Sequence, residues 1–128
     1  MTGLIIKGDT TWAELPMSSA FKSYDDTGND LYIRKVGHVV TIVGCIAPTA
    51  TISGSSDLVQ INDSALPSDY RPITNARAIQ KGSASNIWVC IVSTDGYVNF
   101  TRYRNTNSYA SVYQGAQLFV NITYMTAD

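Results

Sequence analysis

The fold is decided by the stretch LYIRKVGHVVTIVGCI, residues 31–46. It is rich in β-branched and other apolar residues on both sides of a glycine, which predicts two strands, 31–36 and 38–46, joined by a tight break at Gly37. In the second strand one face carries His38, Val40, Ile42, Gly44 and Ile46, and the other carries Val39, Thr41, Val43 and Cys45. Because both faces are largely apolar, we expect this strand to be buried on both sides.

Five more strands lie outward from this pair. Short runs rich in β-branched and aromatic residues predict strands at 58–61, 77–81, 86–93, 98–104 and 117–124. Asp95-Gly96 predicts a hairpin turn, since glycine supplies the positive φ that a tight reversal needs. Two prolines exclude regular structure at residues 66–72. The pattern predicts an all-β, antiparallel sandwich or barrel without any helix of three turns.

The composition supports this fold class. Valine (10), isoleucine (12) and threonine (13) make up 35 of the 128 residues, and these side chains lose rotamer freedom in helices but pack well in sheets. Leucine, lysine, glutamine and glutamate together number only 15. A helix bundle, a coiled coil and an α/β enzyme with long helices are therefore excluded. We assign residues 12–128 to one domain and residues 1–11 to a lead-in or connector.

Charge and hydropathy exclude several partners. The formal net charge is −1, so the chain is not a polycation suited to nucleic acid or to an anionic membrane. The longest apolar stretch, residues 39–47, is far shorter than the ~18 residues of a membrane span, and we expect no membrane insertion. Residues 1–7 lack a basic region followed by a longer apolar block, so we expect no signal peptide.

Few residues are available for catalysis or metal binding. The chain has one histidine, His38, and one glutamate, Glu14, and it lacks the G-x-S-x-G, H-E-x-x-H, Walker and Rossmann patterns. Acidic and amide oxygens at residues 25–30 are of the type that binds calcium, but turn composition explains them more simply. We therefore expect no enzyme, no cofactor and no metal site.

Cys45 and Cys90 each lie in an apolar run. They are either two buried thiols or a disulfide between strands, and without a signal peptide the thiols are favoured. A zinc site would need a C-x-x-C pair or further ligands, which the sequence lacks.

A set of motifs goes beyond the fold class. Trp12 precedes YIRKVGHVVTIVG at 32–44, which is followed by LPSDYRP at 66–72, DGYV at 95–98 and a final apolar strand that ends in Tyr124. In order and spacing these motifs resemble the C-terminal receptor-binding head domains of bacteriophage tail and baseplate proteins, most of all those of phages that infect Gram-positive bacteria. The resemblance covers residues 12–124.

The resemblance implies a jelly-roll-like head that forms a homotrimer on the virion, at the tail tip or baseplate, in contact with other tail proteins. It also implies non-catalytic binding of host cell-surface polysaccharide or teichoic acid, and assembly in the bacterial cytoplasm. Phe119 and Tyr97, on expected outer faces, agree with apolar surface that a partner copy covers. Two alternatives are a trimeric structural knob and a depolymerase, which needs two carboxylates roughly 5–9.5 Å apart.

Saccharide recognition combines flat apolar faces with planar hydrogen-bonding groups. The densest such stretch is RYRNTNSY, residues 102–109, at the end of a hairpin, where sandwich loops commonly bind ligands. The predicted ligand contacts are Arg102, Tyr103, Arg104, Asn105, Tyr109 and Tyr113, with Trp88 and His38 in second rank. The alternative is a polar strand end in which arginine stems pack on tyrosine rings, with Trp88 in the core.

Overall fold

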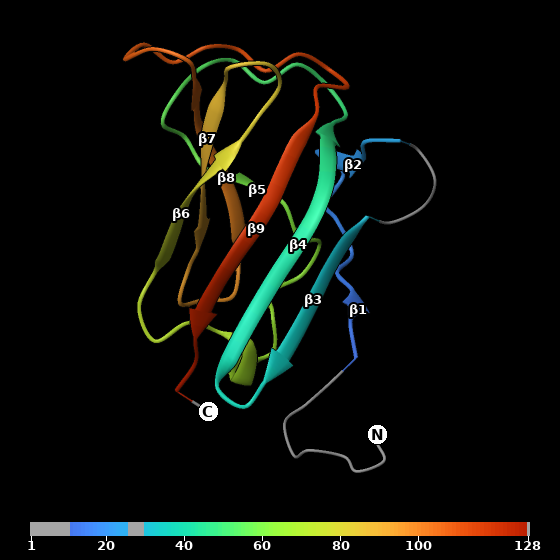
Figure 1. Ribbon diagram of the computed structural model, residues 1–128, viewed down its shortest axis with the longest axis vertical. Coiled ribbons are helices and arrows are strands. Elements are labelled where there is room, and N and C mark those ends of the chain that lie inside the picture. The colour runs from blue at the N-terminus through green and yellow to red at the C-terminus, as the bar shows by residue number, and fades with distance from the viewer. Residues whose placement is uncertain (1–10, 26–29, 128) are drawn as a thin grey trace.

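Two antiparallel sheets face each other in the computed structural model, which describes residues 11–25 and 30–127 (Figure 1). The first sheet contains β1 (Ala13–Glu14), β2 (Phe21–Ser23), β3 (Leu31–Val36), β4 (Val39–Pro48) and β9 (Leu118–Met125). The second contains β5 (Val59–Gln60), β8 (Val98–Arg104), β7 (Ile87–Val92) and β6 (Ala76–Lys81), in that order. The helical segment η1 (Ser68–Tyr70) lies between β5 and β6. Within the described ranges, no helix is long and apolar enough to cross a membrane.

The antiparallel, all-β sandwich or barrel predicted from the sequence is confirmed. All seven predicted strands form, and their ends lie within two residues of the predicted positions. Two short strands, β1 and β2, were not predicted. Residues 1–10, which make up nearly all of the expected lead-in, lie outside the described residues.

The long strand β4 organises the first sheet. Along one edge of β4, β3 pairs with residues 39–44 and β2 pairs with residues 46–48. Along the other edge, β9 pairs with β4 from Val39 to Ile46. Val40, Ile42 and Ile46 point inward and have no exposed surface. The residues between them stay partly exposed, so the expectation that β4 is buried on both sides is wrong for the single chain. The reason is that the second sheet covers only the inner face.

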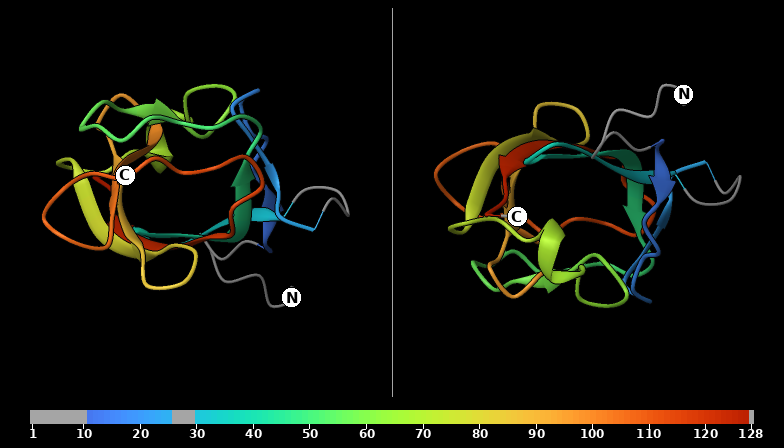
Figure 2. Two further views of the ribbon diagram at one scale, coloured as in Figure 1. Left: turned by 90° about the horizontal axis from the view of Figure 1, so that it is seen from above. Right: turned by 90° about the horizontal axis from the view of Figure 1, so that it is seen from below.

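Hydrogen bonds join the two sheets along both seams and curl them toward a barrel (Figure 2). At one seam, the Ser18 N–H donates to the carbonyl of Ile61 (2.7 Å) and the Asp63 N–H donates to the carbonyl of Pro16 (2.9 Å). At the other seam, the Gln80 side-chain amide replaces a missing strand pairing. Its Nε2 donates to the Asn121 carbonyl (3.1 Å) and its Oε1 accepts from the Asn121 N–H.

Aromatic rings fill the space between the sheets. Phe100 lies 5.1 Å from Trp88, 5.8 Å from Phe21 and 6.1 Å from Tyr103, measured between ring centroids. A β-bulge opposite Trp88 allows Phe100 and Tyr103, three residues apart on one strand, to point into the same core. The extra residue is Arg102, whose φ of +56° is rare for a side chain of this type.

The LPSDYRP motif closes the lower end of the barrel, where the Gly37-His38 turn, η1 and the 93–97 turn lie (Figure 1). The Leu66 N–H donates to the carbonyl of Gly96 (2.9 Å), and Arg71 Nε donates to the carbonyl of Leu66 (2.8 Å). Gly96 has φ +93°, and a Cβ there would lie 2.8 Å from the Leu66 nitrogen. The motif therefore packs against the Asp95-Gly96 turn and seals this end of the core.

Candidate functional site

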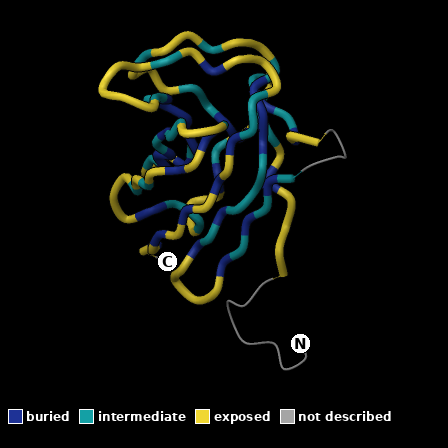
Figure 3. The backbone as a smooth tube through the Cα atoms, turned by 45° about the horizontal axis from the view of Figure 1, so that its top comes forward, coloured by how far each residue is buried: buried dark blue, intermediate teal, exposed yellow. Residues whose placement is uncertain are grey.

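Three loops gather at the upper end of the molecule, namely residues 49–58, 82–86 and 105–117 (Figure 1). Asp57 is the only charged residue in these loops. Serine, threonine, asparagine, glycine and tyrosine predominate, and this is the composition of loops that bind ligands by rigid rings and adaptable hydrogen bonds. Figure 3 shows these loops largely exposed, in contrast to the alternating burial along the strands.

Backbone hydrogen bonds hold the longest of the three loops in place. The Ala110 N–H donates to the carbonyl of Tyr103 (2.8 Å), and Val112 exchanges two hydrogen bonds of 2.9 Å with Ile52. The side chain of Val112 has no exposed surface. Because the loop is anchored at these points, its backbone is held in place, which would lower the entropic cost of binding a ligand there.

An open pocket of about 510 Å³ lies between the 82–86 turn and the second half of the 105–117 loop. This volume is within the range of about 300–1,000 Å³ that small-ligand sites occupy. We call it the upper pocket, and it is lined by Ser83, Asn86, Tyr103, Ala110, Ser111, Tyr113, Gln114, Gly115 and Ala116. Its rim carries the Tyr113 ring, which is 72% exposed, and its wall is Tyr103, which is only 5% exposed.

The position of the Tyr103 ring is set by its neighbours. The ring packs on Phe100 on one side, and a Cβ placed on Gly82 would lie 2.6 Å from its Cε1 atom. Beyond Tyr103, a second hollow next to Asp57 and Val59 holds only about 10 Å³, which is room for about one water molecule. Tyr103 is therefore a fixed wall that separates the upper pocket from this smaller space.

Two of the predicted contacts, Tyr103 and Tyr113, line the upper pocket. Arg102 and Arg104 flank Tyr103 on β8 and are half-buried, and neither lines the pocket. Asn105 and Tyr109 are exposed in the adjoining loop, where Tyr109 forms a β-bridge with Arg104. The structure thus brings the predicted stretch to the upper end of the molecule, but only its tyrosines, and not its arginines, line the pocket.

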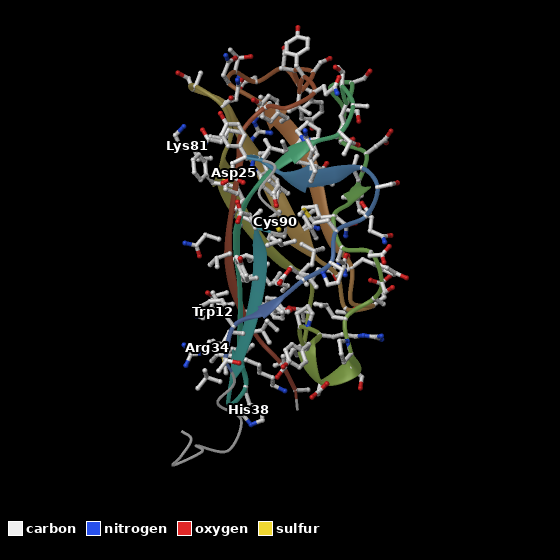
Figure 4. All side chains as sticks on the ribbon, turned by 90° about the vertical axis from the view of Figure 1, so that its right-hand side faces the viewer. Trp12, Asp25, Arg34, His38, Lys81 and Cys90 are labelled. Carbon is white, nitrogen blue, oxygen red and sulfur yellow. The ribbon has the colours of Figure 1, made fainter. Side chains whose placement is uncertain are left out.

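The two second-rank residues lie elsewhere. Trp88 has no exposed surface, and its Nε1 donates to the Lys81 carbonyl (3.2 Å), so it is a core residue that no surface ligand reaches. His38 is exposed in the turn at the lower end (Figure 4). The ten residues of β4 separate it from the upper end, a span of roughly 30 Å at about 3.3 Å per residue. Neither residue belongs to the upper pocket.

Sequence reasoning missed the polar residues of the upper pocket. These residues are Ser83, Asn86, Ser111 and Gln114. They come from two loops that are distant in the chain. The loops meet because β6 and β8 end, and β7 and β9 begin, at the upper end of the molecule. The sequence signal that could have indicated them is the absence of charged residues from these two loops. The loops around residues 83 and 111 are polar and uncharged, unlike the turns at the lower end, which contain Asp69, Arg71 and Asp95.

Titratable groups are scattered rather than gathered in a centre. Among the described residues, no three histidine, cysteine, aspartate or glutamate side chains converge as metal ligands. Asp26 and Asn29 of the acidic turn lie outside the described residues, whereas partial burial and the nearby Asp25 carboxylate raise the pKa of Asp30. Cys45 and Cys90 are free thiols, and burial raises the pKa of Cys90 to about 12.

The outer face of the first sheet carries a second notable surface. Val36, Val39 and Met125 face one another across β3, β4 and β9, and Ile73 lies beside Met125. Their exposed fractions are 41%, 38%, 59% and 60% for Val36, Val39, Met125 and Ile73. We call these four residues the apolar row. Higher on the same face, Trp12 lies beside Arg34, with 5.8 Å from the guanidinium to the indole centroid (Figure 4).

Comparison with known proteins gives no family. No protein-family model matches the chain, and no curated protein matches it.

Proposed function

We propose that this chain is the receptor-binding head domain of a bacteriophage tail or baseplate protein. In this proposal it attaches the virion to a saccharide on the host cell surface, either wall polysaccharide or teichoic acid. The order of the motifs from Trp12 to Tyr124 supports the family, and the all-β fold is the class that this family requires. The observation that carries the binding role is the upper pocket, in which tyrosine rings and hydrogen-bonding groups converge at an open end.

The chemistry of the pocket supports binding without cleavage. Its lining contains no carboxylate, and glycoside hydrolysis generally requires two. The single glutamate, Glu14, lies in β1 and pairs with Tyr32 on the first sheet. A pocket of neutral groups can hold a sugar but offers no carboxyl group to act as general acid or nucleophile.

Three copies in a homotrimer would raise the weak affinity of a shallow site by avidity. The apolar row supports self-association, because exposed apolar side chains that face one another across strands are a common mark of interfaces. The proposal places the trimer on the virion after assembly in the bacterial cytoplasm, in contact with other tail proteins.

The test is retention of the labelled domain on isolated cell walls from a panel of Gram-positive bacteria. We expect walls of at least one species to pellet the domain, and heat-denatured domain is the control for non-specific adhesion. Absence of retention on every wall preparation would contradict the proposal.

A structural knob that caps a tail fibre is the second candidate, and the apolar row favours it as well, because a knob needs only the trimer. This alternative predicts a stable trimer that no wall preparation retains. The two proposals are therefore separated by the same pelleting assay, combined with a measurement of mass in solution.

A further inference from the structure

The lining of the upper pocket is uncharged throughout. It contains two serine hydroxyls, two tyrosine hydroxyls and the side-chain amides of Asn86 and Gln114, but no ammonium, guanidinium, imidazole or carboxylate. A phosphodiester placed there would lose part of its hydration and gain no charge-assisted hydrogen bond. A sugar hydroxyl, which both donates and accepts, finds matching partners among these groups.

The nearest lysine is engaged elsewhere. Lys81 Nζ donates to the carbonyls of Gly82 and Ala84, each at 3.1 Å, and lies 5.7 Å from the centroid of the Phe119 ring. Figure 4 shows this side chain projecting outward from the sheet. Its ammonium group therefore braces the outer side of the 82–86 turn and is not directed into the pocket.

The two arginines of β8 do not line the pocket. Tyr103 points inward and forms the pocket wall. Arg104 follows Tyr103 directly and projects to the opposite face of the strand, and Arg102 is half-buried at the bulge. The bulge at Arg102 fixes this division, since it adds one residue between the inward-facing Phe100 and Tyr103.

The neutral polar groups of the pocket are open to a ligand. Within the part of the chain that the structure describes, the side chains of Ser83, Ser111, Tyr113 and Gln114 make no hydrogen bond to other residues. Ala110 and Ala116 add apolar surface beside the Tyr103 ring. The combination of a fixed ring, a second exposed ring and several neutral donors and acceptors matches the C–H faces and hydroxyls of a pyranose.

From these observations we infer that the upper pocket takes an uncharged sugar unit, and that the anionic backbone of teichoic acid is not its ligand. This inference rests on the proposed function and narrows it from two classes of wall polymer to one. The exposed Tyr113 ring is the principal sugar-contacting group, and the β8 arginines take no part in recognition.

The test uses walls that retain the domain in the pelleting assay. Tyr113→Ala should weaken retention roughly 5- to 10-fold, because it removes the exposed ring. Tyr113→Phe, which keeps the ring, should stay closer to the original protein. The double variant Arg102→Ala, Arg104→Ala should stay within about twofold. Circular dichroism confirms that each variant is folded.

Ionic strength and a soluble competitor give independent readouts. Retention should change little when sodium chloride rises from about 0.05 to about 0.5 M, because neutral contacts are not screened. Soluble poly(glycerol phosphate), a teichoic acid backbone without sugar, should not release the domain from the walls.

The outcomes distinguish a failure of the proposed function from a failure of the neutral-sugar inference. If no walls retain the original domain, the proposed function fails and this inference fails with it. If walls retain it but retention falls with salt, with poly(glycerol phosphate) or with loss of the two arginines, the proposed function stands and the neutral-sugar inference is overturned. Retention that is indifferent to Tyr113→Ala also overturns the inference.

Discussion

Residues 102–104 illustrate what a sequence pattern conveys at the scale of single side chains. The run Arg-Tyr-Arg predicted three groups acting together at one end of the molecule, and the structure places all three at the upper end of β8 (Figure 1). The division between Tyr103 and the arginines depends on the bulge at Arg102, which no local pattern signals. The pocket wall also depends on Gly82, which is distant in the chain and leaves room for the Tyr103 ring.

Gly82→Ala tests this packing directly. The added Cβ would lie 2.6 Å from Tyr103 Cε1, so the ring must shift, and we expect the free energy of unfolding to fall by about 1–3 kcal/mol. Chemical denaturation measures the loss. Ser83→Ala, in the same turn, is the matched control and should cost little. Equal stability of the Gly82→Ala variant and the original protein would show that Tyr103 is not held as described.

At the scale of elements, the seven predicted strands form because each carries its own alternation of apolar side chains. β2 lacks that signal. Its three residues, Phe21–Ser23, are a strand because they pair with residues 46–48 of β4, which is a tertiary contact. The polar residues of the upper pocket were missed for the same reason, since loop contacts are set by where strands end. The Gln80 seam, meaning the two hydrogen bonds between the Gln80 side-chain amide and the Asn121 backbone, was also not predicted. There a side chain takes the place of a paired backbone strand.

The Gln80 seam leads to a prediction about local stability. Gln80→Ala removes the partners of the Asn121 N–H and carbonyl, and we expect a loss of about 1–3 kcal/mol together with faster hydrogen exchange at the Asn121 amide. Exchange is followed by NMR. Gln117→Ala, a half-buried glutamine outside the seam, should leave that amide protected. Unchanged exchange at Asn121 in the Gln80 variant would contradict the role of the seam.

The whole molecule has three unlike surfaces. The lower end is sealed by the 66–72 segment, the upper end is open and nearly uncharged, and the outer face of the first sheet carries the apolar row. Sequence composition anticipated the surplus of apolar surface, since both faces of β4 are apolar. It did not indicate which end carries the upper pocket, because that depends on which loops meet.

The apolar row carries the prediction about assembly. We expect light scattering after size-exclusion chromatography to give the mass of three 13.9 kDa chains. The double variant Val39→Lys, Met125→Lys should run as a monomer, because charges in an apolar interface lose hydration without gaining a partner. Ile79→Lys alters a more exposed side chain on the second sheet and should leave the trimer intact. A monomeric original protein, or a trimeric double variant, would refute this assignment.

The central claim is that the open, uncharged end of the barrel binds a cell-surface sugar. The most direct measurement is an amide NMR spectrum of the domain during titration with soluble polysaccharide released from walls that retain it. The account predicts that signals from residues 82–86 and 110–116 shift, while those of the 37–38 turn and the apolar row stay in place. Shifts confined to Arg102 and Arg104 of β8, to the lower end or to the first sheet would contradict it.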